Sequence, residues 1–163
     1  MRRKQKKVRW TFFPLNRPTS SLLRGDLEPG FKVSSARKNP GQSAFFYHSL
    51  TDVIPDHYYL ATKRSDTRIK DRRVHQSFMK DEIFDAGKSE ATYNNSIIRI
   101  YDKERMLIEL MRSRARIPLD YYKEVIQSYR KLSFELDFGL VEDYAAMFRN
   151  GAGLMEMIQM EVL

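Results

Sequence analysis

The sequence predicts an α+β fold in which a small mixed or antiparallel sheet is followed by four C-terminal helices. Two observations support this. Most strand-like stretches fall within residues 57–101, whereas apolar residues at helical spacing fill residues 102–163. The chain has 163 residues, of which 42% are hydrophobic, and this suffices for one domain with a buried core.

The first quarter of the chain differs from the rest in charge and composition. Residues 1–42 hold eleven Lys and Arg residues against two acidic residues, and four of the six prolines. We interpret residues 1–42 as an irregular basic extension with a short strand at Gly30–Ser34, and residues 43–163 as the folded domain. An excess of basic charge beside a near-neutral body indicates an anionic partner such as DNA, or a solvated tail.

The first elements of the body are short. Ser43–Leu50 is expected to be a helix with Ser43 as its N-cap, followed by a turn that contains Pro55. Residues His57–Thr62 are aromatic and apolar, and Val74–Phe78 alternate, so both stretches predict strands.

A helical turn and a hairpin follow. Residues Asp81–Asp85 are expected to form one helical turn that Gly87 ends. Strands at Ala91–Tyr93 and Ile97–Tyr101 are expected to be joined by a turn at Asn94–Asn95, because Asn tolerates a positive φ.

The last sixty residues predict four helices. The first covers Asp102–Arg114, with Asp102 as its cap, and Pro118 is expected to be the first residue of the second. Apolar residues at helical spacing place the third helix around residues 141–148. Gly151 and Gly153 are expected to interrupt the chain before the fourth.

Composition argues against several classes of protein. The chain has no cysteine, which excludes disulfide scaffolds, Cys-ligated metals and thiol catalysis, and its three histidines fall in separate elements. No metal or cofactor is therefore expected. No run reaches the roughly 18 apolar residues of a membrane span, and no apolar stretch follows the basic start. We expect a cytoplasmic protein without a membrane partner.

Asp102 and Glu104 are the most enzyme-like residues, because they follow a predicted strand. Two carboxylates at such a place can bind Mg²⁺ in a nuclease or a nucleotidyl transferase. In the alternative interpretation, Asp102 caps a helix and Glu109 pairs with Arg105 or Arg112. We prefer the alternative, because no further acid or lysine lies at a suitable spacing, and we expect no catalytic residues.

The loop between the first two predicted strands is a candidate nucleic-acid-binding site. Six basic residues fall within eleven positions, and clustered Lys and Arg side chains neutralise phosphates. They are Lys63, Arg64, Arg68, Lys70, Arg72 and Arg73. Asp66 and Asp71 lower the net charge, and a solvated loop would have a similar composition.

Three short motifs resemble those of a known family. Leu50–Pro55 supplies L-T-D-x-x-P, Ile98–Arg105 supplies [IV]-x-[IV]-Y-D-x-E-R, and Glu161–Leu163 supplies a final E-V-L. The segments Tyr129–Arg130 and Asp143–Ala145 are also similar. Over about residues 43–163, the chain resembles the C-terminal region of the AbiEi family, the antitoxins of bacterial type IV abortive-infection toxin–antitoxin systems.

The resemblance implies a non-catalytic antitoxin or regulator of phage defence. It would counter a nucleotidyltransferase-type toxin without forming a stable complex with it. Members of the family begin with a winged helix–turn–helix that represses their own promoter. Residues 1–42 are too few and too rich in proline for that domain. A DNA-binding transcriptional regulator that uses the basic arm and the 63–73 loop is the alternative function.

The signature residues of the resemblance have two interpretations. They could form an antitoxin surface, or they could hold turns, helices and sheet together, which is the interpretation we prefer. These residues are Asp52, Pro55, Tyr101, Asp102, Glu104 and Arg105.

Overall fold

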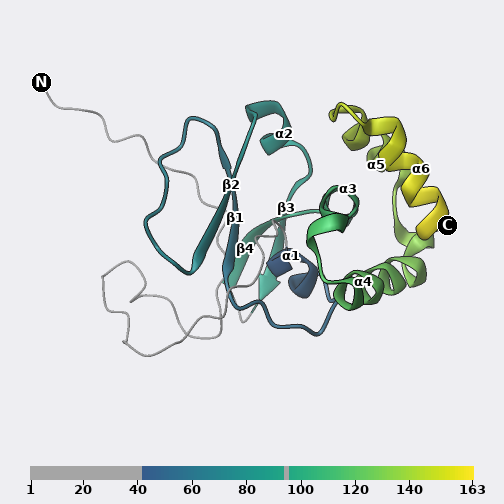
Figure 1. The fold of residues 1–163 in the computed structure, drawn as a ribbon, viewed down its shortest axis with the longest axis horizontal. Coiled ribbons are helices and arrows are strands. Elements are labelled where there is room, and N and C mark those ends of the chain that lie inside the picture. Colours follow the sequence, from purple (N-terminus) through teal and green to yellow (C-terminus); the bar gives the residue numbers. More distant parts are fainter. Residues whose placement is uncertain (1–41, 94–95) are drawn as a thin grey trace, which may run out of the picture.

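The computed structural model describes residues 42–93 and 96–163, and it confirms an α+β fold. The predicted strand at Gly30–Ser34 and the predicted turn at Asn94–Asn95 lie outside the described residues. In Figure 1 the strands occupy one side of the molecule and the last three helices the other, with helix α3 between them.

The first sheet consists of two parallel strands. Helix α1 (Gln42–Tyr47) begins before Ser43, so Ser43 lies inside the helix and is not its cap. Strands β1 (Tyr58–Lys63) and β2 (Val74–Met79) follow, with Tyr58 opposite Val74. The ten residues 64–73 must run back along the whole strand, about 20 Å, before β2 can begin parallel to β1.

The second sheet is an antiparallel hairpin. Helix α2 (Asp81–Asp85) ends before Gly87, whose φ of 73° confirms its predicted role as a stop. Strands β3 (Lys88–Tyr93) and β4 (Ser96–Tyr101) pair with each other. In the described part of the chain, the strands therefore form two small sheets and not the single sheet that we predicted.

Four α-helices make up the C-terminal half, as predicted. They are α3 (Lys103–Ser113), α4 (Leu119–Lys131), α5 (Phe138–Ala146) and α6 (Gly151–Glu161). Short 3₁₀ turns follow α3 and α4. Pro118 is the cap residue just before α4 and not its first residue.

The glycines before the last helix do not interrupt it. Gly151 and Gly153 lie in the first turn of α6, so the prediction of a break was wrong. A Cβ at Gly151 would lie 2.5 Å from the carbonyl oxygen of Ala145, at the end of α5. Gly151 therefore allows the start of α6 to lie close to the end of α5.

Helix α3 is the centre of the core. Eight of its eleven residues are buried, and the five apolar ones among them pack with residues of β4, α4, α5 and α6 in one hydrophobic cluster. Within the described ranges, no helix has the length and apolar character to cross a membrane.

Candidate functional site

The beginning of α3 is a polar junction around Asp102. Its Oδ1 accepts a hydrogen bond from the backbone N–H of Arg105 at 2.7 Å, which confirms the predicted cap. Its Oδ2 accepts a hydrogen bond from the hydroxyl of Tyr144 at 2.9 Å. Burial raises the pKa of Asp102, and both hydrogen bonds partly oppose that shift. Both carboxylate oxygens therefore have partners in the fold.

Glu104 and Tyr129 hold the same end of α3 to neighbouring helices. Oε1 of Glu104 accepts a hydrogen bond from the backbone N–H of Asp137 at 3.2 Å, and the hydroxyl of Tyr129 donates to the carbonyl of Lys103 at 2.9 Å. The carboxylates of Asp102 and Glu104 thus make structural contacts. Over the residues that the structure describes, no three His, Asp or Glu side chains gather where a metal could bind.

A buried ion pair lies one turn further along α3. Nη2 of Arg105 is 2.7 Å from Oε1 of Glu109, and Nη1 of Arg112 is 2.7 Å from Oε2 of the same carboxylate. Arg105 is fully buried, and its guanidinium lies over the rings of Tyr101 (5.2 Å) and Phe148 (4.8 Å). Glu109 therefore pairs with both of its predicted partners, and the rings supply further favourable contacts for the buried cation.

His48 joins this junction from the other side, and the sequence alone did not single it out. Its Nε2 lies 2.6 Å from the carbonyl oxygen of Tyr101, so the neutral imidazole donates from Nε2. Burial lowers the pKa of His48, and the hydrogen bond partly opposes that shift. The only signal in the sequence is that a histidine falls near the end of a short predicted helix, and this is too common to be informative.

We expect the stability of the protein to fall as the pH falls through the ordinary pKa of histidine. The unfolded chain binds a proton on His48 more readily than the folded chain does, so acid favours unfolding. Urea unfolding from about pH 7.5 to about pH 5 measures this trend. His48→Gln keeps an N–H donor but does not titrate, so its stability should fall less over this range. Identical pH dependence in the two proteins would contradict the prediction.

The L-T-D-x-x-P motif is attached to α4. The hydroxyl of Thr51 donates to Oε1 of Glu124 at 2.7 Å, and the backbone N–H of Asp52 donates to the same oxygen at 3.2 Å. The hydroxyl of Thr51 also accepts from the N–H of Val53. The turn before Pro55 is therefore held by the side chain of Thr51 and not by that of Asp52. Asp52 is exposed, whereas Pro55 is buried.

The six basic residues of the predicted nucleic-acid site have different surroundings. Lys63 pairs with Asp81 and Asp85 of α2, and Arg73 pairs with Asp71. Hydrogen bonding to Asp85 raises the pKa of Lys63. Arg64 is exposed, but it does not line the groove described next.

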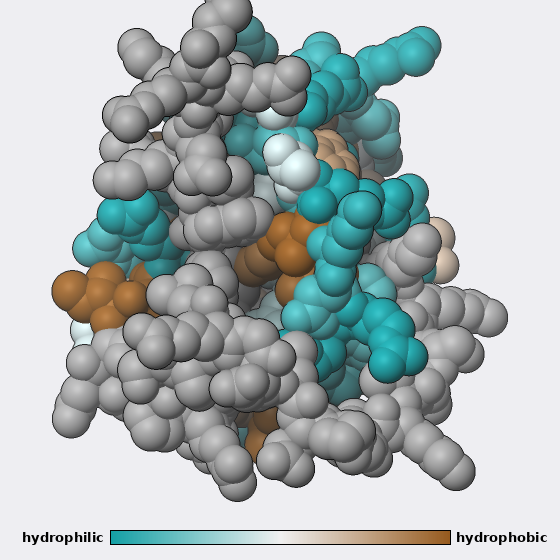
Figure 2. Space-filling model, turned by 90° about the vertical axis from the view of Figure 1, so that its left-hand side faces the viewer, coloured by the Kyte–Doolittle hydropathy of each residue, from teal (hydrophilic) through white to brown (hydrophobic). Residues whose placement is uncertain are grey.

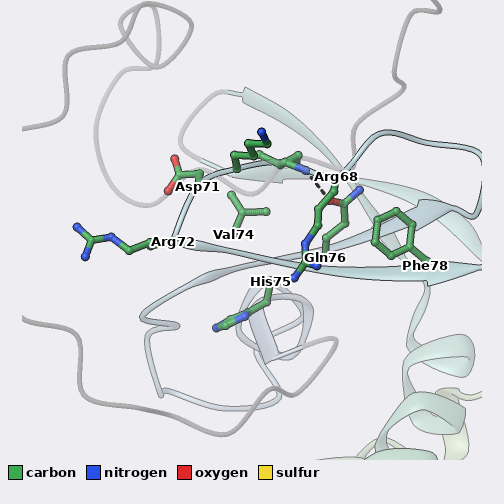
Figure 3. A pocket seen from close by; sticks show the side chains of 9 residues that line it. Arg68, Asp71, Arg72, Val74, His75, Gln76 and Phe78 are labelled. Carbon is green, nitrogen blue, oxygen red and sulfur yellow. Dashed lines mark hydrogen bonds between the residues drawn. The ribbon is translucent and has the colours of Figure 1, made fainter.

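Arg68, Lys70 and Arg72 line a groove of about 650 Å³ beside β2. Val74, Gln76 and Phe78 lie on one side of the strand and His75 on the other (Figure 3). The side chain of Gln76 holds the loop against the strand, because its Oε1 accepts from the N–H of Ile69 at 2.9 Å. We call this hollow the β2 groove.

The face of the molecule that carries β1, β2 and their loop is largely hydrophilic where it is described. Figure 2 shows hydrophilic residues beside small hydrophobic areas on this face. Phe78 contributes an exposed aromatic ring, with 42% of its surface accessible. Exposed basic side chains beside an aromatic ring are typical of surfaces that bind nucleic acid.

Comparison with known proteins found no matching family model and no matching curated protein.

Proposed function

We propose that this chain is a non-catalytic antitoxin or regulator of a bacterial abortive-infection system, which counters a nucleotidyltransferase-type toxin in the cytoplasm. One observation carries the proposal. Four of the five segments through which residues 43–163 resemble the AbiEi family, all but Leu50–Pro55, make direct contacts with one another. Asp102 of the second motif accepts from Tyr144 of the segment 143–145, which lies 42 positions away.

Two further contacts join the motifs. Tyr129 donates to the carbonyl of Lys103, within the second motif, and the side chain of Arg130 donates from Nε to the carbonyl of Glu161 at 2.6 Å. Glu161 begins the final E-V-L, and its carboxylate accepts from Tyr122 and pairs with Arg114. These contacts bring together segments that lie far apart in the sequence, which supports the proposal.

The roles of the two candidate catalytic carboxylates support action through binding. Asp102 caps α3 and accepts from Tyr144, and Glu104 accepts from the backbone of Asp137. A general base or a metal ligand needs an oxygen that faces the substrate or the ion. Both side chains instead connect the beginning of α3 to α5.

Growth rescue tests the proposal. A toxin of the AbiEii type from the same operon is induced in cells that carry either the full chain or an empty vector, and surviving colonies are counted. We expect the full chain to restore growth to the level of uninduced cells. A folded, well-expressed chain that gives no more survivors than the vector would contradict the proposal.

The β2 groove favours DNA binding as a second candidate function. Arg68, Lys70 and Arg72 are exposed and line the same hollow, and within residues 42–93 and 96–163 none of the three makes an ion pair. Such side chains can release counterions when they meet phosphates.

We expect Arg68→Gln/Arg72→Gln to reduce the salt dependence of binding to a short DNA duplex. Loss of two phosphate contacts should lower the slope of log affinity against log salt by about 2. Lys63→Gln/Arg73→Gln is the matched control, because it removes the same charge from residues that are already paired with carboxylates. Fluorescence anisotropy at several salt concentrations measures both. Equal slopes for the two double variants would exclude a specific role for the groove.

A further inference from the structure

A second hollow lies where α3 ends and α4 begins, beside α6. It measures about 450 Å³, and its apolar wall comes from Met111, Ile117, Tyr122 and Met157. Leu119 also lines it, with 62% of its surface exposed. The guanidinium groups of Arg112 and Arg114 stand at its edge. We call this hollow the α3–α4 groove.

The two arginines at the edge are held in place by internal partners. Nη1 of Arg112 pairs with Glu109, and its guanidinium lies 4.1 Å from the centre of the Phe148 ring. Nη1 of Arg114 is 2.6 Å from Oε1 of Glu161. A guanidinium has five N–H donors, and over the described ranges neither arginine has a second carboxylate partner. Both therefore keep donors for an approaching carboxylate.

The lining of this groove is typical of the centre of a protein–protein interface. Such centres are rich in Met, Tyr and Arg and poor in Lys and acidic residues. The α3–α4 groove is lined by two Met, one Tyr and two Arg, and by no Lys, Asp or Glu. Methionine adapts its shape to what it contacts. The groove therefore fits an apolar helix face that carries a carboxylate.

The chain itself presents such a face on α5. Leu140 and Met147 are 39% and 44% exposed, and the exposed Asp143 lies between them in sequence. The spacing i, i+3, i+7 puts Leu140 and Asp143 of α5, and Met147 at its C-cap, on one stripe. The end of α5 lies near the groove, because Phe148, just after α5, is the ring that contacts Arg112.

We infer that two copies of this chain form a dimer through these surfaces, with α5 of each copy in the α3–α4 groove of the other. Leu140 and Met147 cover Leu119 and Met157, and Asp143 meets the free donors of Arg112 and Arg114. Each copy carries both halves of the contact, so a dimer with two-fold symmetry forms the contact twice.

Sedimentation of the full chain, treated with nuclease, tests the inference. We expect a concentration-dependent equilibrium between monomer and dimer. Asp143→Arg should raise the dissociation constant of the dimer at least about tenfold, since it places like charges together at the centre of the contact. Glu142→Arg is the matched control on the same helix: its side chain points about 100° away, and it should leave the dimer intact.

Charge reversal on both sides gives the decisive result. Arg114→Glu alone should weaken the dimer, and Arg114→Glu/Asp143→Arg should restore most of the affinity. Leu119→Ser, a substitution at an exposed site, should weaken the dimer without unfolding the chain, as circular dichroism would confirm. A protein that stays monomeric, or a dimer that Asp143→Arg and Leu119→Ser leave unchanged, would overturn the inference.

Discussion

Replacement of Glu109 by glutamine is expected to lower the free energy of unfolding by about 3–5 kcal/mol. The substitution keeps the shape of the side chain but removes the only carboxylate that pairs with the buried Arg105 within the described part of the chain. An uncompensated charge then remains in the core. Urea unfolding followed by far-ultraviolet circular dichroism measures the loss.

Removal of the other partner is expected to cost less. In Arg105→Met the carboxylate of Glu109 keeps its pair with Arg112, which reaches solvent, so no buried charge is left alone. The double variant Arg105→Met/Glu109→Leu should be more stable than Glu109→Gln, because it buries no charge. Loss of an exposed ion pair lowers the free energy of unfolding by about 1 kcal/mol or less. A loss no larger than this in Glu109→Gln would show that the pair does not stabilise the core as we describe.

Gly87→Ala is expected to cost about 3 kcal/mol, because two unfavourable effects add. The φ of Gly87 is 73°, in the left-handed region that alanine adopts at a cost. Its new Cβ would also lie 2.5 Å from Cβ of Arg105, which is fully buried and cannot move away. In a chain of this size, the loss corresponds to a fall of about 6–12 °C in the melting temperature.

Gly139→Ala is the matched control for that prediction. It adds the same methyl group in the first turn of α5, where the nearest atom is a side-chain oxygen of the exposed Asp137 at 3.1 Å. Its melting temperature should stay near that of the parent, since alanine is the better helix former. Equal effects of Gly87→Ala and Gly139→Ala in calorimetry would refute the close packing of Gly87 on Arg105.

The sequence predicted the helical half well because its signals are local. Asp102 caps α3 as expected, and Gly87 ends the turn after α2. The pairing of strands depends on residues far apart in the chain, so the parallel register of β1 with β2 was missed. The role of Gly151 was also missed, because it depends on the position of Ala145 at the end of a different helix.

The candidate sites were predictable only in part. Spacing suggested the pairing of Glu109 with Arg105 and Arg112, but it did not show that Arg105 is fully buried between the rings of Tyr101 and Phe148. One of these rings comes from β4 and the other from a residue just after α5. A charged residue gives no sign of such burial in its local sequence.

The basic loop shows the same limit. Six basic residues in eleven positions look equivalent in the sequence. The fold, however, places Lys63 beside Asp81 and Asp85 of α2, which lie 18 and 22 residues further along the chain. Arg73 is held by the carboxylate of its near neighbour Asp71. Only Arg68, Lys70 and Arg72 of the six line the β2 groove.

The burial of α3 on nearly every side has a consequence for hydrogen exchange. Amides in a helix surrounded by packed side chains exchange with solvent only when the whole domain unfolds, whereas less buried segments open on their own. None of the six residues of β2 is buried, so its amides should exchange through small local openings. The sheet that carries the β2 groove can therefore loosen and close again while the helical core keeps its structure.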